Sequence, residues 1–135
     1  KVLDKNLGFV IGNITLAAGF IAYSGPFTAE FRQDLVQLWL KKAQDLKLAA
    51  DPYWKCADIL CDPAEIREWC IKSLPSDELS VENAILVTRG RRWPLMVDPQ
   101  SQGNRWIRGM KRDGGLGIIK LSTPNFLRTL ETGIR

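Results

Sequence analysis

The stretch from Trp93 to Ile107 (WPLMVDPQSQGNRWI) most constrains what this chain can fold into. An apolar run stops at Asp98 and Pro99, a polar turn with one glycine follows, and a basic, aromatic segment suited to a helix comes next. A run that is apolar on both faces predicts a strand of a covered parallel sheet. A strand that leads through a turn into a helix is also the layout of a phosphate-binding loop.

The turn lacks most of the groups with which such a loop holds a nucleotide. The working pattern is G-x-x-x-x-G-K-S/T, in which glycines admit phosphate to the backbone amides, the lysine neutralises it and the hydroxyl binds Mg²⁺. Here Arg105 takes the lysine position and Trp106 the hydroxyl position, while an acidic residue or a proline replaces the first glycine. The candidate site residues are Asp98, Pro99, Gln100, Ser101, Gln102, Gly103, Asn104, Arg105 and Trp106. We predict a vestigial loop with no catalytic residue and no metal site; weak nucleotide binding and an unrelated turn are the alternatives.

The segments after the turn continue an α/β pattern. Residues 105–112 predict a helix, residues 116–121 predict a second strand, and Thr123 with Pro124 begins a last helix. Strand, loop, helix, strand and helix in this order predict an α/β fold, namely the first βαβα portion of an incomplete parallel sheet. Because two strands alone do not make a stable sheet, we expect residues outside this chain to complete it.

The first half of the chain predicts helices. Residues 13–24 predict a helix rich in small residues, and Thr28 is expected to cap a second helix that ends near Leu46. From the helical spacing, the predicted core face of this second helix is Phe31, Leu35, Leu38, Trp39 and Leu46, and its predicted outer face is Arg32, Gln33, Lys41, Lys42 and Asp45. Asp62 followed by Pro63 predicts a helix start, and Ser80 is expected to cap a short helix. We divide the chain into residues 1–58 and 59–135.

The run from Asn6 to Ala29 has no charged residue and is long enough to suggest a membrane span or a signal-peptide core. It also contains polar residues, four glycines and Pro26, so we favour a buried helix of a large soluble protein. The glycosylation sequon at Asn13 is common by chance and carries no weight here.

Composition excludes one large class of function. The chain has 135 residues, the size of a modest domain, and contains no histidine. A hydrolase triad built on histidine is therefore absent. Cys56, Cys61 and Cys70 contain no CxxC pair and are predicted to be reduced, mostly buried thiols, with one disulfide and a free thiol as the alternative.

A basic cluster around the turn offers a second class of function. Its members are Arg89, Arg91, Arg92, Arg105, Arg108, Lys111 and Arg112. Together with Trp93 and Trp106 it suits nucleic acid, a membrane surface or an acidic protein. The net charge is only +4, so we favour a solvated face or arginines that reach across a module boundary. The carboxylates of Asp62, Glu65 and Glu68 are assigned to helix capping and dipole interactions rather than to acid–base chemistry.

Several long stretches resemble dynein heavy chains, over nearly the whole chain. GNITLAAGFIAYSGPFTAEFR is similar to the family's G-D-x-x-L-A-A-x-x-x-A-Y-x-G-P-F-T-x-x-x-R run, with Asn13 in place of an acidic residue. DPAEIREWCIKSLPSDELSVENAILV resembles its D-P-x-x-I-R-x-W-x-x-x-x-L-P-x-D-x-x-S-x-x-N-G run, with Ala84 in place of glycine. RRWPLMVDPQSQGNRWIRGM, with IIKLSTPNFLRTLETGIR after it, looks axonemal rather than cytoplasmic.

The resemblance implies a segment that runs from the base of the stalk into the fifth AAA+ module of the motor ring. Residues 1–58 would then follow the stalk and pack on the ring, and residues 59–135 would be the N-terminal part of an AAA+ large subdomain. Family members are ATP-driven, minus-end-directed microtubule motors. The resemblance therefore implies ATP and Mg²⁺ in other modules but no cofactor here, neighbouring AAA+ modules, microtubules and other dynein chains as partners, and no nucleic acid or membrane. It implies an axonemal location in a cilium or flagellum, with the cytoplasm as the alternative.

Overall fold

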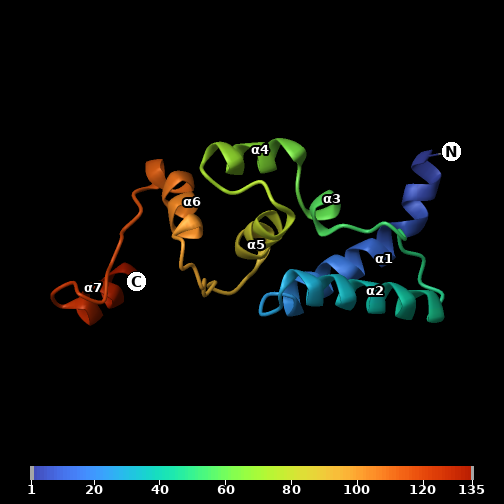
Figure 1. Cartoon of the computed structure of the whole chain (residues 1–135), viewed down its shortest axis with the longest axis horizontal. Coiled ribbons are helices and arrows are strands. Elements are labelled where there is room, and N and C mark those ends of the chain that lie inside the picture. Colours follow the sequence, from blue (N-terminus) through green and yellow to red (C-terminus); the bar gives the residue numbers. More distant parts are fainter. Residues whose placement is uncertain (1, 135) are drawn as a thin grey trace.

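The computed structural model describes the backbone of residues 2–134 and the side chains of residues 8–133, and this part of the chain is helical without a strand (Figure 1). Its α-helices are α1 (Val2–Tyr23), α2 (Ala29–Asp45), α3 (Cys56–Leu60), α4 (Pro63–Ile71), α5 (Glu78–Arg89), α6 (Gln102–Met110) and α7 (Phe126–Ile134), with a 3₁₀ turn, η1 (Arg112–Gly114), after α6. Helices α1 and α2 form an antiparallel pair, and α3 and α5 pack against α1.

The predicted α/β class is therefore wrong for this structure. The segments 93–97 and 116–121, both predicted as strands, have no regular secondary structure in the described chain. The first of them is also unpacked, since Trp93, Leu95 and Val97 are each more than 90% exposed. A strand needs a neighbour to pair its amides and carbonyls, and the described residues contain no strand beside either segment. The apolar pattern was recognised, but the neighbouring strands that such a pattern requires are absent from the described residues.

The core runs from the junction of α1, α2, α3 and α5 to the contact between α4 and α6. Its buried apolar residues are Leu16, Ala17, Phe20, Val36, Leu40, Trp54, Cys56, Trp69, Leu74, Val81, Ala84, Ile85 and Trp106. These residues come from both sides of the predicted division at residues 58 and 59, and that division remains a prediction. Helix α1 begins before the predicted residue 13 and buries one face only, because Ile11 and Ile14 are 71% and 57% exposed. No helix in the described part of the chain combines the length and the apolarity needed to cross a membrane.

The predicted faces of α2 are partly reversed. Its buried stripe is Arg32, Val36, Leu40 and Ala43, and three residues predicted for the core face, Phe31, Leu38 and Leu46, are exposed. Arg32, predicted on the outer face, is only 3% exposed and forms an ion pair of 3.0 Å with Glu82 of α5. Spacing alone favoured the more strongly apolar stripe, whereas the structure buries the stripe that contains a paired cation.

The middle helices begin at acidic caps. The carboxylate of Asp62 accepts a hydrogen bond from the amide of Ala64 at the start of α4, as predicted. Helix α5 is capped by Asp77 rather than by the predicted Ser80, whose amide and hydroxyl both donate to the Asp77 carboxylate. These hydrogen bonds lower the pKa of Asp77.

The three cysteines are free thiols, as predicted, and Cys56 belongs to the core whereas Cys61 and Cys70 are only half-buried. Burial, with Glu82 nearby, raises the pKa of the Cys56 thiol to about 12. Since the thiolate is the nucleophile, Cys56 is inert near neutral pH.

Alkylation of Cys56 should therefore depend on folding. We expect iodoacetamide at pH 8 to label Cys56 roughly a thousandfold more slowly in the native chain than in urea. The reason is that the pKa of its thiol is about 12 in the native chain and 9.0 when the thiol is unperturbed, so far less thiolate is present in the native chain. The native rate should keep rising with pH above 9, where the rate in urea levels off. Mass spectrometry of the peptide that contains Cys56 measures both rates; equal rates in the two states would contradict the assignment.

Gly12 allows α1 to approach the loop before α3. A Cβ atom at this position would lie 2.1 Å from the carbonyl oxygen of Ala49. The contact is reinforced by Asn13, whose side chain accepts from the amide of Asp51 and whose carbonyl accepts from the indole of Trp54.

We expect Gly12→Ala to destabilise the chain by about 1–3 kcal/mol, because the loop must move to admit the methyl group. Gly8→Ala in the same helix is the matched control, since a Cβ there meets nothing within 4 Å. The control should be neutral or stabilise α1 by up to about 1 kcal/mol. Urea unfolding measures both changes, and equal stability of the two variants would refute the close approach.

Candidate functional site

The predicted phosphate loop folds as a turn followed by the start of α6. The Ser101 amide donates to the carbonyl of Asp98 at 3.2 Å, and Ser101 itself has the left-handed backbone angles φ 58° and ψ 25°. Helix α6 then begins at Gln102. The strand of the predicted layout is missing, but the turn leads into a helix N-terminus, the feature by which such loops attract anions.

The amides at this N-terminus are bound by a side chain of the same loop. One carboxylate oxygen of Asp98 accepts from the amide of Gln102 at 2.9 Å, and the other accepts from the amide of Asn104 at 2.8 Å. The helix dipole stabilises this charge as it would an external anion. Asp98 therefore occupies two amide donors that a phosphate would need. Its negative carboxylate would also repel a phosphate.

Arg105 and Trp106, which stand at the lysine and hydroxyl positions of a working loop, differ in exposure to solvent. Arg105 is exposed, so its positive charge remains available to solvent. Trp106 is 1% exposed and packs edge-to-face against Trp69 of α4, with ring centroids 5.8 Å apart and an angle of 71° between the planes. The position that would supply a magnesium-binding hydroxyl instead anchors α6 to α4.

The remaining loop residues have no arrangement that closes on a ligand. A Cβ at Gly103 would make ordinary contacts of 3.4 Å with Met96 and 3.5 Å with Asp98, so this glycine is not needed for close approach. Pro99, Gln100, Gln102 and Asn104 are exposed, and the amide oxygen of Asn104 accepts from Arg108 at 2.7 Å. The structure thus brings Asp98, Gln102 and Asn104 together and leaves Arg105 apart from them.

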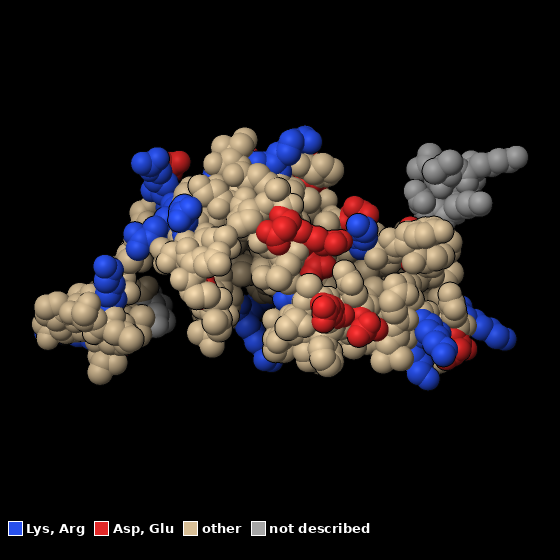
Figure 2. Space-filling model, in the orientation of Figure 1, with Lys and Arg blue, Asp and Glu red and all other residues tan. Residues whose placement is uncertain are grey.

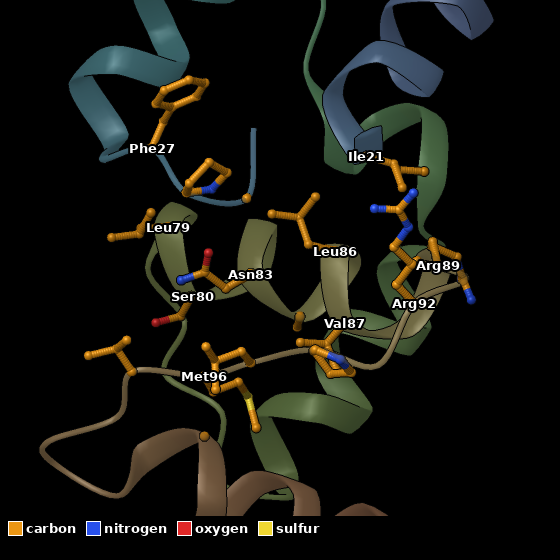
Figure 3. A pocket seen from close by; sticks show the side chains of 18 of the residues that line it. Ile21, Phe27, Leu79, Ser80, Asn83, Leu86, Val87, Arg89, Arg92 and Met96 are labelled. Carbon is orange, nitrogen blue, oxygen red and sulfur yellow. The ribbon is translucent and has the colours of Figure 1, made fainter. Parts of the chain in front are cut away.

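An open groove of about 1610 Å³ lies beside the loop. One wall is α5, with Leu79, Asn83 and Val87, and the chain around Met96 forms the side opposite Phe27 (Figure 3). Asp98 is the only acidic residue among the described residues that line the groove, and its carboxylate already accepts two hydrogen bonds. The groove therefore offers no spare carboxylate for acid–base catalysis.

The predicted basic cluster divides into two parts. Arg89 forms an ion pair with the carboxylate of Glu65 and donates to the carbonyl of Leu60 at 3.1 Å. Arg91 and Arg92 follow α5, whereas Arg105, Arg108, Lys111 and Arg112 lie in α6 and just after it. Figure 2 shows basic side chains gathered at the end of the molecule where α6 lies and acidic side chains over its middle. Of the two tryptophans proposed to stack on bases, Trp93 is 97% exposed but Trp106 is buried. A stacking platform made by both is therefore ruled out.

The carboxylates considered for acid–base chemistry have structural partners. Asp62 caps α4, Glu65 pairs with Arg89, and Glu68 lies 3.9 Å from Lys72. The sequence did not predict that the buried Arg32 would bind Glu82, which is partly buried, and Asn83, which is exposed, on α5. The one available signal was the position of Arg32 in register with Val36, Leu40 and Ala43, four residues that share one helix face.

Comparison with known proteins identifies the family. Residues 67–135 match the model of the ATP-binding dynein motor region. The chain is 50% identical over 132 residues to human dynein axonemal heavy chain 6 and 44% identical over 133 residues to human dynein axonemal heavy chain 2. It is 44% identical over 131 residues to the dynein-1-beta heavy chain of the flagellar inner arm I1 complex of Chlamydomonas reinhardtii.

These matches cover 98%, 98% and 96% of the chain and 3% of each relative, so the chain spans about one thirtieth of the relatives' length. The family expected from the sequence motifs is thereby confirmed. The chain belongs to the dynein heavy chain family and falls in its ATP-binding motor region.

Proposed function

We propose that this chain is a structural module of an axonemal dynein motor, at a degenerate nucleotide site that does not hydrolyse ATP. In this proposal it belongs to the fifth AAA+ module and serves in the axoneme of a cilium or flagellum, as the names of its relatives suggest. Its partners are the neighbouring modules of the same heavy chain, and microtubules and other dynein chains bind elsewhere on the parent protein. ATP and Mg²⁺ are used by other modules.

The observation that carries the proposal is the position of the Asp98 carboxylate. It accepts from the amides of Gln102 and Asn104, the donors that a phosphate-binding loop directs at its ligand. A phosphate entering this site would have to displace a hydrogen-bonded carboxylate and lie beside its negative charge. Two amides of the helix N-terminus are thus bound from within the chain.

The position of Trp106 supports the same conclusion. Catalysis of phosphoryl transfer depends on a metal ion that bridges the phosphates and on a positioned cation. The indole at the metal-binding position is buried against Trp69, so it contributes to packing instead. Arg105 retains charge, but a guanidinium does not replace the compact ammonium of lysine in such a loop.

If Asp98 acts as an internal anion, its removal should expose the site. We expect Asp98→Ala to destabilise α6 by about 1 kcal/mol through loss of the cap. The freed amides should then bind inorganic phosphate, so that phosphate raises the melting temperature of the variant but not of the wild type.

Asp62→Ala is the control for this test, because it removes a carboxylate that caps α4 through one amide and does not touch the loop. Thermal unfolding with and without phosphate, at constant ionic strength, measures the difference. Phosphate stabilisation of the wild type, or of both variants equally, would show that Asp98 does not close a specific site.

The second test asks whether this module binds nucleotide in the parent motor. We expect Arg105→Ala in the full heavy chain to leave both the number of bound nucleotides and the basal ATP turnover unchanged, because the loop holds no triphosphate. Arg108→Ala, on the same helix but outside the lysine position, is the control. Loss of one bound nucleotide per heavy chain in Arg105→Ala alone would refute the proposal and favour an active or nucleotide-binding module.

A further inference from the structure

The buried guanidinium of Arg32 binds the backbone carbonyls of the turn between α1 and α2. Its Nε atom donates to the carbonyls of Ser24 and Phe27, each at 3.1 Å, and one terminal nitrogen reaches the carbonyl of Gly25 at 3.5 Å. The ring of Phe20 lies under the cation, with its centroid 6.0 Å from the guanidinium carbon. Residues 24–27, which we call the corner, are thus held by one side chain.

The same guanidinium binds α5. One terminal nitrogen donates to the carboxylate of Glu82 at 3.0 Å, and the other donates to the amide oxygen of Asn83 at 2.7 Å. These residues lie 50 and 51 positions from Arg32 in the chain. A planar guanidinium with several donors fixes orientation as well as distance, so the contact is directional.

The far end of α5 is held by a second arginine. Arg89, the last residue of α5, donates to the carbonyl of Leu60 at the end of α3 and pairs with Glu65 in the first turn of α4. Gly90 follows at once, and a Cβ there would lie 2.6 Å from the carbonyl of Leu86. Arg32 therefore binds α5 at its middle and Arg89 holds its C-terminal end, and the chain leaves the helix through a restricted position.

Apolar packing contributes little between the corner and the segment that follows α5. The open groove lies between them, with Phe27 at one side and Met96 at the other (Figure 3). Phe27 and Met96 are 39% and 41% exposed. A displacement of the α1–α2 pair can therefore reach this segment through α5, and the polar contacts of Arg32 are a directional link between the corner and α5.

We propose that Arg32 locks the corner to α5, so that a displacement of the α1–α2 pair is transmitted through α5 to residues 90–98 and the start of α6. We call Arg32, Glu82 and Asn83 the Arg32 lock. It is a conformational device rather than a catalytic or binding site. The inference rests on the proposed function, because it takes this chain to be a mechanical part of the motor.

Cys56 reports whether the lock is closed. It lines a second hollow together with Arg32 and Glu82 and is 3% exposed. In the full heavy chain we expect Arg32→Ala to raise the alkylation rate of Cys56 about five- to thirtyfold, because local opening exposes the thiol. Asn83→Ala and Glu82→Gln are milder variants for the case in which Arg32→Ala does not fold. Glu82→Gln keeps the shape of the side chain and an oxygen that can accept from Arg32 but removes the negative charge of the ion pair.

A test of transmission needs a second measurement, one that would stay unchanged if Arg32 had only a structural role. We expect the lock variants to keep basal ATP turnover but to lose microtubule stimulation of that turnover by at least about fivefold, the lower end of typical coupling between sites. Arg67→Ala, at an exposed position of α4, is the control and should behave as the wild type in both assays.

Two results would overturn the inference. Unchanged Cys56 protection in every lock variant would show that Arg32 does not hold the corner. Increased Cys56 labelling with full microtubule stimulation would show a lock that transmits nothing. Nucleotide content is measured in the same preparations, so a failure of the proposed function would appear as nucleotide lost in Arg105→Ala, independently of either result.

Discussion

The burial of one positive charge, on Arg32, determines how the first half of this molecule is arranged. A cation in the core must be surrounded by acceptors, because an unpaired buried charge is too costly to keep. The carbonyls of Ser24 and Gly25 follow the end of α1, where helix carbonyls lack partners and the dipole favours a cation. Glu82 and Asn83 supply the rest from α5. The end of α1, the buried face of α2 and the position of α5 are therefore one solution to a single electrostatic requirement.

The second constraint is the apolar segment 93–97, which has nothing to cover it in the described chain. Trp93, Leu95 and Val97 point at solvent although their pattern is that of a strand buried on both faces. A strand is stabilised mainly by its neighbours, whereas a helix satisfies its own backbone, so helices form where the sheet does not. For this reason the helical elements of the predicted α/β pattern appear in the structure while its two strands do not.

The sequence predicted local features well and long-range ones poorly. The start of α4 at Asp62 follows from capping chemistry within a few residues, and it was found. The cap of α5 was misplaced by three residues, because Asp77 and Ser80 are both good caps and only the structure shows which one accepts. The burial of Arg32 was missed, since its acceptors on α5 lie some fifty residues away. At the loop, the substitutions at 105 and 106 were visible in the sequence, but the two hydrogen bonds of Asp98 depend on a left-handed turn at Ser101 that no pattern announced.

The loop shows how a helix N-terminus can be kept without a ligand. Its first amides need acceptors whether or not a nucleotide is present, because exposed or buried donors without partners weaken the helix. In a working site phosphate fills that need; here the carboxylate of Asp98 does so with two bonds below 3.0 Å. At the position after Arg105, Trp106 packs edge-to-face on Trp69 and joins α6 to α4. The turn therefore combines a helix start that is capped from within the chain with a packing contact to α4.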